Sequence, residues 1–130
     1  MKKLAHIALV VDDYDKAIAY YTNVLGFQLI QDEVLSESKR WVLVSPGDGS
    51  CQLLLARAVG QVQEQAIGNQ SGGRVFLFLH TDTFQQDYER LLSHQVEVVR
   101  QPEAMPYGQV LVFRDMYGNL WDLIGKTQIQ

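Results

Sequence analysis

The amino-acid sequence predicts an α+β fold made of two tandem βαβββ modules, which form curved mixed sheets around a cleft. One apolar run opens at His6 and another at Arg74, and each is followed by an amphipathic segment and three further apolar runs. A shift of 68 residues superimposes the run 42–44 on the run 110–112. Self-similarity at one fixed spacing is typical of a supersecondary unit that is used twice. Side chains at matching strand positions of the two modules are therefore expected to converge in the cleft.

The first half of the chain follows the order strand, helix and three strands. Residues 4–11 form a continuous apolar run with β-branched side chains, which is typical of a buried strand. Asp12 and Asp13 are suitable helix N-caps, apolar residues then recur at helical spacing, and Gly26 predicts the end of the helix. Strands are expected at 27–34, 40–45 and 51–56, with polar turns between them.

The same order restarts after a stretch that lacks any period. Residues 58–73 contain four glycines among Gln and Ser, so we expect a linker there. Module 1 is then residues 1–57 and module 2 is residues 74–130, both within a single domain. The second half predicts a strand at 74–79, a helix at 83–94 and strands at 96–100, 109–113 and 120–124.

Composition and charge exclude several classes of protein. The net charge is −4, and no Lys/Arg run is longer than two residues, which disfavours binding to nucleic acid. No apolar run is long enough for a membrane span or a signal peptide, so we expect a cytoplasmic protein that does not bind a membrane. A single cysteine, Cys51, excludes an internal disulfide and fits a reducing compartment.

Motifs at both ends of the chain resemble the signatures of the vicinal-oxygen-chelate superfamily. The opening His-Ile-Ala-Leu-Val-Val-Asp-Asp at 6–13 is joined by Val-Leu-Gly-Phe at 24–27 and by Phe-Arg-Asp-Met-Tyr-Gly-Asn-Leu-Trp-Asp-Leu at 113–123. That superfamily includes glyoxalase I lyases, extradiol dioxygenases, fosfomycin-resistance transferases and bleomycin-resistance binding proteins. The resemblance implies the βαβββ fold but leaves the activity open, because one fold supports many functions.

The resemblance also implies a divalent-metal site with one ligand from the first and the fourth strand of each half. Carried over position by position, the ligands fall on His6, Gln52, Arg74 and Asp122. Arg74 departs from the pattern, because the family has His there and a guanidinium has no lone pair to donate. His6, Gln52 and Asp122 could hold Ni, Zn, Mn or Fe, but the charge of Arg74 opposes a cation. We therefore expect a degenerate site without tightly bound metal.

The same positions supply the candidate residues for ligand binding and catalysis. The expected ligand-binding residues are Arg74, Phe76, Phe78 and Gln52, and the expected catalytic residues are His6 and Asp122. Strand alternation puts Phe76 and Phe78 on the face of Arg74, giving an aromatic floor with a cation at one end. Such a floor suits a planar or anionic small molecule. Arg74 could instead pair with Asp122 and close the site, and the sequence does not fix which way Trp41 and Phe113 point.

Three functions remain open on this sequence. The primary hypothesis is a glyoxalase/bleomycin-resistance-like protein that binds a small anionic or aromatic molecule. It would act as a lyase or isomerase if His6 or Asp122 serves as a base and Arg74 stabilises an enolate. The alternatives are a metal-free protein that sequesters its ligand, and a true metal-dependent glyoxalase I-type lyase. A homodimer is expected, because exposed strand edges are commonly buried by pairing.

Overall fold

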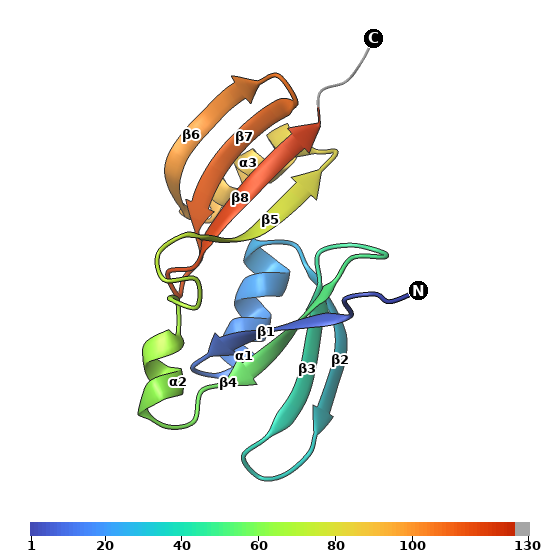
Figure 1. Cartoon of the computed structure of the whole chain (residues 1–130), viewed down its shortest axis with the longest axis vertical. Coiled ribbons are helices and arrows are strands. Elements are labelled where there is room, and N and C mark those ends of the chain that lie inside the picture. Colours follow the sequence, from blue (N-terminus) through green and yellow to red (C-terminus); the bar gives the residue numbers. More distant parts are fainter. Residues whose placement is uncertain (127–130) are drawn as a thin grey trace. The chain divides into compact units, whose positions relative to one another are not determined.

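Two units of similar topology make up the chain (Figure 1), one spanning Met1–Ile67 and the other Gly68–Gln130. The computed structural model describes residues 1–126. Each unit contains a four-stranded mixed sheet, with the strand order β1-β4-β3-β2 in the first and β5-β8-β7-β6 in the second. The predicted pair of βαβββ modules is thereby confirmed. The boundary between the units lies inside the stretch 58–73 that the sequence assigns to a linker.

The first unit begins with β1 (His6–Val11), α1 (Tyr14–Ala19) and η1 (Tyr20–Val24), a π-helical turn. Asp13 caps α1 as expected, since its carboxylate accepts a hydrogen bond of 2.9 Å from the backbone N–H of Lys16. The strands β2 (Gln28–Val34), β3 (Arg40–Ser45) and β4 (Gln52–Arg57) follow within a residue of the predicted bounds. One short helix, α2 (Gln61–Ala66), lies in the expected linker and contacts β1. Six residues are too few to show a helical period in the sequence.

The second unit contains β5 (Val75–Thr81), α3 (Phe84–Ser93), β6 (Glu97–Met105), β7 (Gly108–Arg114) and β8 (Leu120–Lys126). Strand β6 extends five residues beyond the predicted end at 100. The sequence does not predict this extension, because it contains Pro102 and proline usually interrupts a strand. It is tolerated here since the register between β6 and β7 shifts between Arg100 and Glu103, where Pro102 lies.

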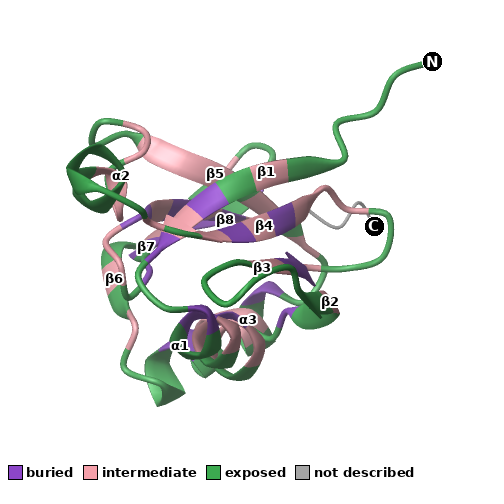
Figure 2. Ribbon diagram, turned by 90° about the horizontal axis from the view of Figure 1, so that it is seen from below, coloured by how far each residue is buried: buried purple, intermediate pink, exposed green. Residues whose placement is uncertain are grey.

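In each unit, buried residues lie on the strands and on the helix that contacts them, and Figure 2 colours these buried stretches purple. In the first unit, Leu9 and Leu55 are fully buried on adjacent parallel strands, and α1 contacts β3 and β4. In the second unit, Phe113 and Trp121 stack at 5.8 Å between ring centroids, and α3 contacts β6 and β8. Trp121 therefore points away from the face of Asp122, as strand alternation predicts.

The turn between β7 and β8 is organised by one buried carboxylate. The Oδ1 atom of Asp115 accepts hydrogen bonds from the backbone N–H groups of Tyr117, Gly118 and Asn119 at 3.0–3.1 Å. Its Oδ2 atom accepts 3.0 Å hydrogen bonds from the Asn119 amide and the Trp121 indole. Asp115 is only 3% exposed, so these donors replace the water that the carboxylate loses. The Asp-x-x-Gly-Asn motif of the sequence is therefore a structural clamp that fixes where β8 begins.

A glycine joins this clamp to the segment that enters the second unit. Gly68 has φ +73°, and a Cβ atom there would lie 1.8 Å from the carbonyl oxygen of Tyr117. Any side chain at this position would push the segment away from the turn.

Replacing Asp115 with Asn is expected to lower the free energy of unfolding by about 2–4 kcal/mol, because an amide nitrogen would face the donors of Asn119 and Trp121. Urea denaturation followed by circular dichroism measures this difference. Asp48→Asn, at an exposed turn position between β3 and β4, is the matched control and is expected to change stability by less than about 0.5 kcal/mol. Equal stability of the two variants would show that the carboxylate does not hold the turn.

Candidate functional site

In the first unit, two of the predicted site residues lie side by side. His6 and Gln52 are register partners on the parallel strands β1 and β4, so their side chains project from the same face of the sheet. Leu9 and Leu55 point to the opposite face, toward α1. We call the face that carries His6 and Gln52 the His6 face. His6 is exposed and Gln52 is half-buried there, which leaves an imidazole and an amide available to a ligand.

An aromatic ring that the sequence could not place also belongs to this face. The indole of Trp41 on β3 meets the imidazole of His6 edge-on, with 6.0 Å between ring centroids and an interplanar angle of 76°. Edge-to-face contact of this kind is favourable and orients both rings. The first unit thus presents a hydrogen-bonding imidazole beside a broad apolar ring.

In the second unit, four strands contribute one residue each to a row that crosses the sheet. Phe78 on β5 is the register partner of Asp122 on β8, Asp122 is the partner of Val112 on β7, and Val112 is the partner of Arg100 on β6. We call their common face, opposite Trp121, the Asp122 face. Phe78 is 64% exposed, so its ring is open to contact. Sequence reasoning overlooked Arg100, because only the register shows that it shares a face with Asp122.

Asp122 lies between two apolar register partners, Phe78 on β5 and Val112 on β7. Burial raises the pKa of its carboxyl group, and the positive charge of Arg100 acts in the opposite direction. No hydrogen bond or ion pair to the side-chain carboxylate of Asp122 forms within residues 1–126. The carboxyl group is therefore available to a donor or a proton on a bound molecule.

Arg74 and Phe76 do not lie in the regular strand alternation that the sequence predicts for 74–79. Strand β5 begins at Val75, so the exposed Arg74 precedes it, and its carbonyl accepts a 2.5 Å hydrogen bond from the hydroxyl of Ser71. The β5–β8 register shifts between Val75 and Leu77, which leaves Phe76 without a partner on β8. Among the described residues, no ion pair joins Arg74 to Asp122.

The donor chemistry of the implied metal site is a poor fit. Of the four positions, His6 and Asp122 offer good metal ligands, Gln52 offers a neutral oxygen, and Arg74 offers none. Arg100 adds a second positive charge that acts on Asp122. Within the part of the chain that the structure describes, no group of three His, Cys, Asp or Glu side chains is arranged to hold a metal ion.

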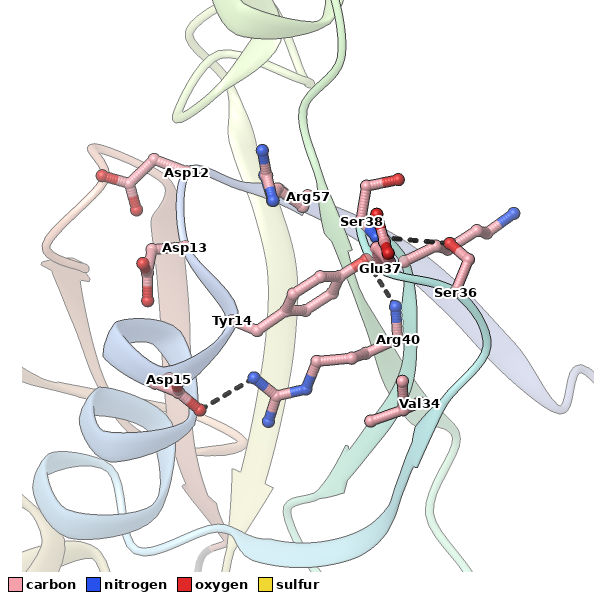
Figure 3. Close-up of a pocket in the computed structure, with 11 residues that line it drawn as sticks. Asp12, Asp13, Tyr14, Asp15, Val34, Ser36, Glu37, Ser38, Arg40 and Arg57 are labelled. Carbon is pink, nitrogen blue, oxygen red and sulfur yellow. Dashed lines mark hydrogen bonds and ion pairs between the residues drawn. The ribbon is translucent and has the colours of Figure 1, made fainter.

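A polar pocket of about 570 Å³ lies elsewhere in the first unit, around the start of α1 and the β2–β3 hairpin (Figure 3). Arg40 binds Asp32 through Nη2 at 2.6 Å and Asp15 through Nη1 at 2.8 Å, and its backbone N–H donates to the hydroxyl of Tyr14 at 3.2 Å. These hydrogen bonds, that of Asp32 most of all, hold the pKa of Arg40 above its usual range. The guanidinium is already paired, so the cluster mainly fastens α1 to the hairpin.

Comparison with known proteins shows which family the chain matches. Residues 3–123 match the model of the Glyoxalase/Bleomycin resistance protein/Dioxygenase superfamily. A protein of Shewanella frigidimarina (strain NCIMB 400) is 54% identical over 125 residues, which cover 95% of this chain and 93% of that protein. Within residues 1–126, no helix has the length and apolar character needed to cross a membrane.

Solved structures resemble the chain over nearly its whole length. UcmS2 superimposes with a TM-score of 0.80 at 30% identity, covering 95% of this chain and 98% of that one. TnmS3, an antibiotic binding protein from Streptomyces sp. CB03234, superimposes with a TM-score of 0.75 at 26% identity, covering 98% of both chains. FosX from Listeria monocytogenes, at 16% identity and a TM-score of 0.69, shares the fold. With 121 of its residues matched by the family model, the chain belongs to the Glyoxalase/Bleomycin resistance protein/Dioxygenase superfamily.

Proposed function

We propose that this protein binds a small aromatic molecule without a tightly held metal, in the manner of the bleomycin-resistance branch of its superfamily. The observation that carries the proposal is the pairing of aromatic rings with polar groups on each sheet. Trp41 lies against His6 on one face, and the exposed Phe78 is the partner of Asp122 on the other. Flat rings next to hydrogen-bonding groups are the usual components of a site for a planar ligand.

The comparisons support this choice of branch. TnmS3 is described as an antibiotic binding protein, and it covers nearly the whole chain at 26% identity. A lyase or isomerase is the second candidate, favoured by the Asp122 carboxyl, which has no hydrogen-bond partner in the described chain and could accept a proton from a ligand. Mass spectrometry of a ligand recovered after incubation separates the two, since a binding protein returns it unchanged.

Binding of an aromatic ligand at the His6 face is expected to quench the fluorescence of Trp41. Titration with bleomycin and with 2-naphthoate measures this effect, and Trp41→Phe removes the signal while leaving the emission of the buried Trp121. In a calorimetric titration, Phe78→Ala is expected to weaken binding of a ligand held at the Asp122 face about five- to tenfold, because it deletes the exposed ring of that face. Tyr107→Ala removes a similarly exposed ring from the turn between β6 and β7 and is expected to have no effect. Failure of both probes to bind the wild type would contradict the proposal.

Weak or absent binding of divalent metal is expected in the wild-type protein, because Arg74 supplies charge where the family supplies an imidazole. Arg74→His is expected to raise the affinity for Ni²⁺ or Zn²⁺ at least about tenfold. Asp122→Glu is a second change, because the longer side chain brings the carboxylate closer to the metal position. Calorimetric titration of protein without an affinity tag makes the comparison. Tight stoichiometric metal in the wild type, lost in His6→Ala, would favour the metal-dependent glyoxalase I-type lyase instead.

We further propose that the protein is a homodimer. Each sheet has two edge strands, β1 and β2 in the first and β5 and β6 in the second, and unpaired edges favour association. Sedimentation velocity at micromolar concentration is expected to give the mass of two chains. A monomer across the whole concentration range would contradict this expectation.

A further inference from the structure

The Asp122 face carries two opposite charges that do not neutralise each other. Asp122 on β8 and Arg100 on β6 are separated by Val112 on the strand between them, and neighbouring strands lie about 4.8 Å apart. The charge of Arg100 acts on Asp122, yet no ion pair joins the two in residues 1–126. From Asp122 to Arg100, the row thus passes from a negative charge, across the apolar Val112, to a positive charge.

The present partner of Arg100 is easily displaced. Its Nη2 atom lies 2.9 Å from Glu103, three residues along the same strand, and the two side chains are 57% and 53% exposed. Exposed ion pairs of this kind stabilise a protein by less than about 1 kcal/mol. A carboxylate on a ligand could therefore take the place of Glu103 and use the planar donor fork of the guanidinium.

Phe78 completes the row at its acidic end. Its ring is the register neighbour of Asp122 and is 64% exposed, so an aromatic group that reaches Asp122 also contacts an aromatic surface. We propose that the Asp122 face selects dipolar aromatic acids, with the anionic group held by Arg100 and a cationic or hydrogen-bond-donating group held by Asp122. This inference rests on the proposed binding function and specifies the class of ligand.

A matched set of four small probes tests the inference by isothermal titration calorimetry. The dipolar probe is 4-(aminomethyl)benzoate. The other three lack one charge or both: 4-methylbenzoate is an anion, 4-(aminomethyl)benzamide is a cation, and 4-methylbenzamide is neutral. Wild-type protein is expected to bind the dipolar probe about tenfold more tightly than either singly charged one. The neutral probe is expected to bind most weakly.

Two variants assign the charges to their partners. Arg100→Gln is expected to weaken binding of the two carboxylate-bearing probes about tenfold and to leave 4-(aminomethyl)benzamide within about twofold. Asp122→Asn is expected to do the reverse, weakening the two probes that carry an aminomethyl group. Arg74→Gln tests whether the cation that precedes β5 holds the anionic group instead. Arg90→Gln, at an exposed position of α3, is the negative control. Glu103→Gln is the positive control, because releasing Arg100 is expected to tighten binding of the anionic probes.

The outcomes separate this inference from the proposed function. Equal affinities for all four probes, or an anion preference that Arg74→Gln removes and Arg100→Gln retains, would overturn the inference and leave the binding function in place. Absence of binding by all four probes would also overturn it. The separate titrations with bleomycin and 2-naphthoate decide the binding function itself.

Discussion

Parallel pairing of the first and the fourth strand in each module is the constraint on which the rest of the structure depends. The backbone hydrogen bonds of β1 with β4 and of β5 with β8 bring residues from the two ends of each module into adjacent positions. His6 becomes the neighbour of Gln52, and Phe78 becomes the neighbour of Asp122. Because side chains alternate along a strand, this pairing also sends Leu9 and Trp121 to the helix-covered faces. A shift of one residue would exchange the faces.

The sequence predicted the order of the strands well, because apolar runs bounded by Gly, Pro and Asp residues are a local signal. Irregularities within strands were not predictable. The shift between Val75 and Leu77 changes which aromatic residue of β5 pairs with β8, and nothing local to residues 74–79 reveals it. The helix at Gln61–Ala66 was not predicted for a related reason. Its six residues form less than two helical turns and show no apolar face in the sequence.

Candidate site residues were proposed from the sequence where a motif marks them and were overlooked where only tertiary pairing does. His6 and Asp122 follow from the resemblance of the terminal motifs to a family. Trp41 and Arg100 lie on β3 and β6, and their positions depend on cross-strand register. In β6 that register shifts twice, around Arg100, so counting residues from the helix cannot place the guanidinium on the Asp122 face.

Replacing a metal ligand by arginine changes the chemistry that this fold can offer. A divalent ion presents positive charge to any oxygen that reaches it, whereas a guanidinium presents directed donors in one plane. Arg100 supplies such donors two strands away from the Asp122 carboxyl, and Arg74 removes a lone pair from the implied metal site. Under the proposed binding function, recognition depends on the spacing between a donor and an acceptor on the ligand, which a sheet fixes through the distance between its strands. Such spacing favours selective binding over Lewis-acid catalysis at these residues.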